Sequence, residues 1–147
     1  MGFELVAFIG KSSELRKWKE RLPSAVVCDL GGDLGLVPVT GKLSQDLRAL
    51  DRTEQRWGKE ASANGAVAYI DIGEFGNQSH EEATLWSDGR EVLSRATIAA
   101  MLAHFRDKAG LDLGDRPIEA ELERQRGEDA AERWVAAASA TNGDGVR

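Results

Sequence analysis

The chain of 147 residues contains a single cysteine, Cys28, and this scarcity excludes an internal disulfide. A chain without disulfides is typical of a reducing compartment, so we expect a cytoplasmic protein. Long apolar runs are also absent, since none approaches the roughly 20 residues that span a bilayer. The N-terminus lacks the basic region and the small-residue cleavage site of a secretory signal. We therefore expect no membrane association.

Complete catalytic motifs are missing as well. Gly10, Lys11 and Ser12 follow an apolar run, as in a phosphate-binding loop, but the glycine required five positions earlier is replaced by Leu5. No spaced motif aligns Cys28 with a histidine as a nucleophile and its base. The sequence therefore predicts no catalytic residue and no cofactor, and it favours a non-enzymatic protein.

The net charge of −6 is concentrated in one segment of the chain. Residues 66–93 hold six acidic side chains against one basic side chain, Arg90. A surface of this kind repels nucleic acid and attracts basic surfaces. The charge pattern therefore predicts a basic protein partner and argues against nucleic-acid binding.

Apolar periodicity predicts strands that alternate with helices in the first half of the chain. The continuous apolar run 3–9 is typical of a strand buried on both faces. Leu43, Leu47 and Trp57 line one face of a helix. Pro38 suggests that its strand lies at an edge or carries a bulge. The predicted strands cover 3–9, 24–30, 34–40, 66–75, 82–86 and 90–93, and the predicted helices cover 12–22, 42–60, 98 to about 110, and 117–139.

The order of these elements is β-α-β-β-α-β-β-β followed by helices, and the first six have the ferredoxin-like order. We expect an α+β fold with a mainly antiparallel sheet, helices on one face and a helical C-terminus. A single domain is expected over residues 1–140, with a flexible tail at 141–147. Periodicity also predicts burial of the four tryptophans, Trp18, Trp57, Trp86 and Trp134.

The best candidate for a site lies between residues 69 and 89. Adjacent side chains on a strand point to opposite faces, so Glu81 and Glu82 cannot converge on one ligand. A metal centre needs several converging ligands, and this segment has one histidine and no spaced ligand motif. We therefore predict no metal ligand. We predict instead a solvated acidic surface that binds a partner through Asp71, Glu74, His80, Glu81, Glu82 and Asp88.

Residues 68–92 carry a recognisable hairpin pattern. It consists of a tyrosine, an acidic residue two positions later, an aromatic-glycine turn, and an alanine-rich strand that ends in Trp-x-Asp/Asn-Gly. The pattern, with the apolar residues 34–40, covers about a third of the chain and resembles small bacterial proteins that look like immunity or antitoxin partners of toxins. The resemblance implies a protein that binds and neutralises another protein, and it brings no catalytic residue. Its residues are Tyr69, Asp71, Phe75, Gly76, Ala83, Trp86, Asp88 and Gly89.

These observations favour a non-enzymatic protein-binding module that engages a basic partner through its acidic β-meander. One alternative is a small-ligand protein or enzyme with a pocket between sheet and helices, in which His80 and a nearby carboxylate act as acid and base. Another is an assembly protein in which the charged helix 117–139, with its thin apolar stripe, pairs between chains as a homo-oligomer.

Overall fold

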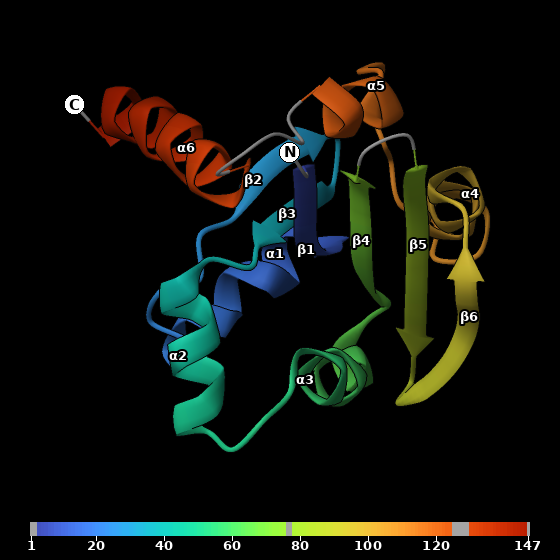
Figure 1. The fold of residues 1–147 in the computed structure, drawn as a ribbon, viewed down its shortest axis with the longest axis horizontal. Coiled ribbons are helices and arrows are strands. Elements are labelled where there is room, and N and C mark those ends of the chain that lie inside the picture. The colour runs from blue at the N-terminus through green and yellow to red at the C-terminus, as the bar shows by residue number, and fades with distance from the viewer. Residues whose placement is uncertain (1–2, 76–77, 125–129, 147) are drawn as a thin grey trace.

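A six-stranded antiparallel sheet forms the centre of the protein (Figure 1). The computed structural model describes residues 3–75, 78–124 and 130–146. The prediction of an α+β fold with a mainly antiparallel sheet is confirmed. The strands are β1 (Phe3–Lys11), β2 (Cys28–Gly31), β3 (Leu34–Pro38), β4 (Val67–Phe75), β5 (Gln78–Ser87) and β6 (Arg90–Ala96), in the order β2-β3-β1-β4-β5-β6.

The first four strands have the ferredoxin-like arrangement that the element order predicts. Their order in the sheet is β2-β3-β1-β4, so both helical connections cross over one face. Side chains of α1, η1, α2 and α3 form one apolar core with this face of the sheet. These elements are α1 (Ser12–Leu15), the 3-10 helix η1 (Arg16–Glu20), α2 (Gly41–Ala49), α3 (Glu54–Ala61) and a short 3-10 turn, η2 (Ser62–Asn64).

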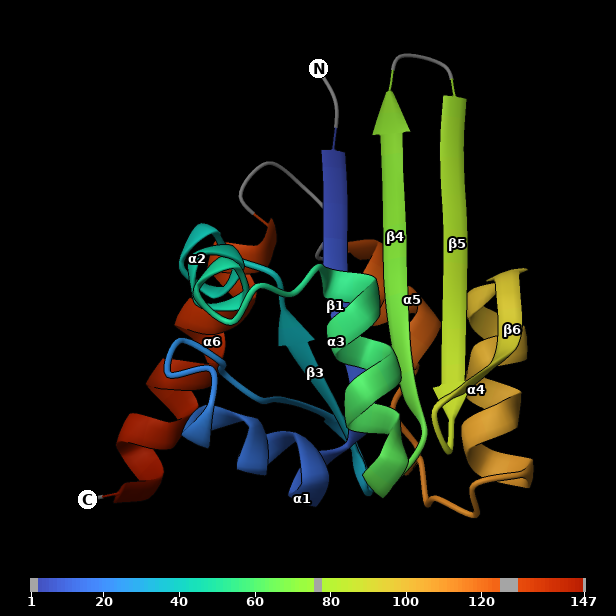
Figure 2. The same ribbon diagram turned by 90° about the horizontal axis from the view of Figure 1, so that it is seen from below.

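The remaining helices cover the opposite face of the sheet, as Figure 2 shows. They are α4 (Ile98–Asp107), α5 (Ile118–Arg124) and α6 (Ala130–Val146). The expectation that all helices lie on one face is therefore wrong. The physical reason lies in β1, where Phe8 is buried toward the first group of helices and Ile9 toward the second. A strand that is apolar on both faces needs cover on both faces.

Two local expectations are also corrected. The helix expected over 42–60 is two helices, because Thr53 accepts a hydrogen bond from Arg56 N at 3.1 Å and so begins α3 as an N-cap. The strand of Pro38 is not an edge strand, since β3 lies between β2 and β1. The alternative, a bulge, has a counterpart in the β2–β3 pairing, where the register shifts between Asp29 and Gly31 of β2. The pairing of β3 with β2 stops at Leu36, which lies opposite Cys28, the first residue of β2. Pro38 comes two residues later, so the missing N–H of Pro38 costs no hydrogen bond to β2.

The C-terminal helices pack against the sheet of their own chain. Ile118 and Leu122 of α5 and Trp134 of α6 are buried in the core that includes β1 and β4. These apolar side chains, which suggested pairing between chains, therefore already have partners, and homo-oligomerisation stays a prediction. The sequence also predicts that Gly127 interrupts the helix expected over 117–139, but Gly127 lies outside the described residues. α6 continues through 141–146, where a tail is expected.

The burial predicted for the four tryptophans is confirmed, because each is less than one tenth exposed. Within the described parts of the chain, no helix has the length and apolar character needed to cross a bilayer.

The contact between α3 and β5 depends on a glycine, which gives a test of this packing. A Cβ on Gly58 would lie 2.5 Å from the buried ring of Trp86. Gly58→Ala should lower the free energy of unfolding, because overpacking costs roughly 1–3 kcal/mol and exceeds the ~1 kcal/mol gained in helix propensity. Gly41→Ala, at the open start of α2, is the matched control and should be neutral or stabilising. Urea unfolding compares the two variants, and equal effects would contradict the packing.

Candidate functional site

The pairing of β1, β4 and β5 places nine residues in a grid on the face of the sheet that carries α1–α3. The three strands pair antiparallel and in register, so residues directly opposite share this face. We call this grid the open sheet end. Its rows across β1, β4 and β5 are Glu4, Gly73 and His80, then Val6, Asp71 and Glu82, then Phe8, Tyr69 and Thr84.

Helix cover decreases along the rows of the open sheet end. Phe8 is fully buried, and the next row along the strands, Val67 and Trp86, is buried beneath α3. Val6 and Asp71 are half-buried, and Glu4 is exposed at the far end. Figure 2 shows that β4 and β5 extend beyond α3 on this side. The grid is therefore a surface that changes from an apolar floor to a solvated acidic end.

Three of the predicted partner-binding residues lie together on the open sheet end: Asp71, His80 and Glu82. The structure adds Glu4, which is 67 positions before Asp71 in the chain. Sequence reasoning missed Glu4 because its membership depends on the pairing of β1 with β4. The signal that was available is the alternation of Glu4 with the apolar Leu5, but it does not specify a register.

The other three predicted residues lie elsewhere. Glu81 is on the opposite face, where its Oε2 accepts a hydrogen bond from Ile98 N at 3.0 Å at the start of α4. Glu74 alternates with Gly73 and so also lies on the α4–α6 side of the sheet. Asp88 is in the turn between β5 and β6, at the far end of β5. The predicted group of six therefore does not form one surface.

The ionisable groups of the open sheet end influence one another strongly. His80 Nε2 lies 2.9 Å from Asp71 Oδ1. The side chain of Glu4 is exposed, but partial burial of its carboxyl group raises its pKa, and a hydrogen bond to Asp71 and the negative charge of Asp71 raise it further, against the lowering effect of His80. Burial likewise raises the pKa of Tyr69, helped by the negative charges of Glu54, Asp71 and Glu4. The surface therefore carries a concentrated negative field close to a half-buried phenol.

A cavity of about 640 Å³ lies between η1 and α3, next to the start of β4. Two tryptophans, Trp18 and Trp57, contribute to its wall, and their rings meet edge to face at 5.5 Å. His80 is not among its lining residues. The pocket expected between sheet and helices therefore exists, but the histidine expected to act in it lies on the open surface instead.

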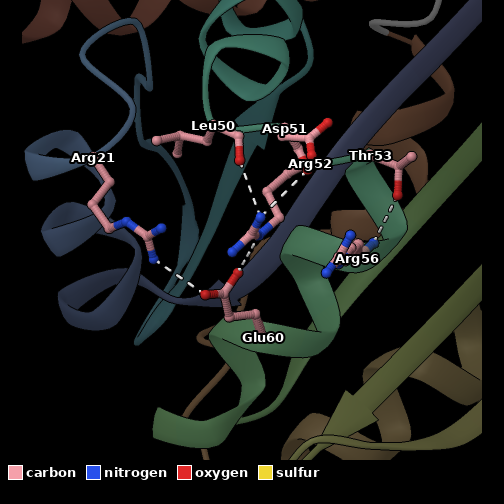
Figure 3. A network of polar contacts seen from close by, with 7 residues as sticks. All are labelled: Arg21, Leu50, Asp51, Arg52, Thr53, Arg56 and Glu60. Atoms are coloured by element: carbon pink, nitrogen blue, oxygen red, sulfur yellow. Dashed lines mark hydrogen bonds and ion pairs between the residues drawn. The ribbon is translucent and has the colours of Figure 1, made fainter.

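Most charged groups around this cavity are paired, Lys17 with Glu14 and Arg21 with Glu60. Figure 3 shows the network at Glu60, which Arg52 also joins. Glu60 accepts hydrogen bonds from Arg52 Nε at 2.9 Å and from Arg21 Nη1 at 3.3 Å. Arg52 Nη1 also donates to the carbonyl oxygens of Leu50 and Asp51, at 3.0 and 3.3 Å. The network joins Arg21, just after η1, to the α2–α3 connection and to α3, and it is a structural clamp between these elements.

Comparison of the chain with protein-family models, with curated proteins and with solved structures finds no match.

The alternation of β5 gives two adjacent glutamates different roles, which mutation can separate. Glu81→Ala should lower the free energy of unfolding by about 1 kcal/mol, because Ile98 N loses its acceptor at the start of α4. Glu82→Ala should change it by less than about 0.5 kcal/mol, since the side chain is exposed. Denaturant unfolding measures both, and a larger effect at Glu82 would contradict the register.

The clamp at Glu60 predicts a pH dependence of stability. The hydrogen bond from Arg52 is the largest cause of the lowered pKa of Glu60, and Arg21 adds to it. A lowered folded-state pKa stabilises the fold above the unfolded value, roughly pH 4.3, and this stabilisation is lost as pH falls through the folded value. Glu60→Gln should therefore be less stable than wild type at pH 7, by up to about 1 kcal/mol.

Urea unfolding at pH 7 and pH 3.5 measures this difference, which should shrink at the lower pH. Glu119→Gln is the matched control. Glu119 is exposed on α5 and forms no ion pair with any of the described residues. A difference for Glu60→Gln that stays constant or grows toward pH 3.5 would contradict the clamp.

Proposed function

We propose that this protein is a non-enzymatic binding module that engages a basic segment of another protein through the open sheet end. The observation that carries this proposal is the composition of the grid. Glu4, Asp71 and Glu82 contribute three carboxylates, and none of its nine positions holds lysine or arginine. Complementary charge of this kind steers a cationic partner and fixes its orientation.

The same surface also offers apolar contact. Val6 and Tyr69 are half-buried between the acidic end and the covered floor. Aromatic groups are enriched at the centre of protein interfaces, whereas charged groups are typical of the rim. Tyr69 is suited to the centre of such an interface, with Glu4 and Glu82 at its rim. A partner segment with lysine or arginine beside an apolar residue matches this arrangement.

The resemblance to immunity and antitoxin proteins supports the same proposal, because such proteins act by covering a surface of another protein. Under this proposal the protein neutralises or regulates its partner in the cytoplasm. Burial raises the pKa of the Cys28 thiol to about 12, which keeps it protonated and unreactive, as suits a protein without redox or nucleophilic chemistry.

The proposal is tested by isolating the partner and then reversing one charge. Affinity purification from the native host at low salt supplies the partner, and titration calorimetry with the purified pair measures the dissociation constant. Glu82→Lys should weaken binding about tenfold or more, and binding should weaken further with added salt, because attraction between rim charges is screened.

Glu119→Lys makes the same change of charge on the opposite face and should alter the dissociation constant less than about twofold. An equal effect of the two variants would show that only net charge matters and would contradict a localised site. Unchanged binding in Glu82→Lys would contradict the use of the open sheet end.

A further inference from the structure

Three side chains at the acidic corner of the open sheet end bring metal-ligating atoms together. A carboxylate oxygen of Glu4, a carboxylate oxygen of Asp71 and a ring nitrogen of His80 all lie within 4.8 Å of one another. Within residues 3–75, 78–124 and 130–146, no other group of three or more such side chains comes this close. Each of the three comes from a different strand, so the antiparallel pairing of β1, β4 and β5 holds their backbones in place.

Electrostatics favours a cation at this corner. Two carboxylates held at this separation repel each other, and the repulsion is stronger where burial lowers the local dielectric. The side chains of Asp71 and His80 are 37% and 35% exposed, which leaves a path from solvent while excluding much of the water. A divalent cation between the oxygens converts the repulsion into attraction.

The spacing is compatible with coordination after small side-chain rotations. Zinc binds carboxylate oxygen and imidazole nitrogen at about 2.0–2.2 Å, so tetrahedral ligands lie roughly 3.4 Å apart. His80 Nε2 and Asp71 Oδ1 are already 2.9 Å apart. The Glu4 side chain is exposed, and its rotamers can close the remaining distance without any change in the sheet.

The donor set also indicates the kind of cation. Magnesium and calcium prefer all-oxygen sites, whereas imidazole suits zinc and related transition metals. We propose that Glu4, Asp71 and His80 bind one Zn²⁺, with the fourth position open to water or to a ligand of the cation. This inference goes beyond the proposed protein-binding function and does not rest on it, because the cation is held by this chain alone.

Zinc titration of the purified protein tests the site directly. Tag-free protein, treated with chelator and dialysed, is titrated with ZnCl₂ by calorimetry and by competition with a chromophoric zinc indicator. Wild type should bind one Zn²⁺ per chain at micromolar or lower concentration. His80→Ala and Asp71→Asn should each bind at least tenfold more weakly, because each removes one of the three ligands.

Two control variants make the test specific to this corner. His104→Ala removes the other histidine of the chain, which lies on α4, and should leave zinc affinity within about twofold of wild type. Glu82→Gln removes a neighbouring negative charge outside the three ligands and should weaken binding only a few-fold. Circular dichroism confirms that each variant is folded before titration.

The proposal is overturned if wild type binds no zinc, if His80→Ala binds as tightly as wild type, or if His104→Ala abolishes binding. Binding of Mg²⁺ or Ca²⁺ with no binding of Zn²⁺ also overturns it, because the imidazole would then have no role. The assay contains no protein partner. Its failure therefore leaves the proposed protein-binding function standing, and a failure of partner binding leaves the zinc result standing.

Discussion

The in-register antiparallel pairing of β1 with β4 and of β4 with β5 is the constraint on which the rest of the structure depends. It decides which side chains share a face across segments that are far apart in the chain. Through this pairing β1 contributes Ile9 to the core under α4–α6 and Phe8 to the core under α1–α3. A shift of one residue would exchange the two faces and place Asp71 in an apolar core. The fold and the acidic surface therefore share one cause.

The same alternation allows charge to be used in two ways within a few residues. On one face the carboxylate of Glu81 lies at the start of α4. There it accepts a backbone hydrogen bond and interacts favourably with the positive end of the helix dipole. On the other face Glu82 is exposed, and its side chain forms no hydrogen bond with any of the described residues. The position of α3 sets the limit of the exposed surface. Helix α3 covers Trp86 through its contact at Gly58, whereas Asp71, further along the sheet, is only half-buried.

Much of the fold was predictable because local pattern carries it. The alternation of Tyr69, Ile70, Asp71 and Ile72 predicts a strand with one dry face, and the burial of these residues agrees. The early start of β5 at Gln78 was not predictable, since its first residues are polar and are held as a strand by pairing with β4. The helices on the second face follow from the apolar run in β1, because Phe8 and Ile9 are both buried and point to opposite faces.

The candidate site was predictable only in part for a similar reason. Composition located the acidic segment, and alternation separated Glu81 from Glu82. Neither one brings Glu4 to Asp71 and His80, because that contact exists only once β1 pairs with β4. The site is a product of tertiary register, which a single sequence specifies weakly.

The most direct test of the central claim is a map of backbone amide shifts by nuclear magnetic resonance during titration with the isolated basic partner. If the open sheet end is the interface, the largest changes lie in three short segments that meet there, residues 4–6, 69–73 and 80–84. Changes confined to α4, α5 and α6 would place the interface on the opposite face and contradict the role of the open sheet end.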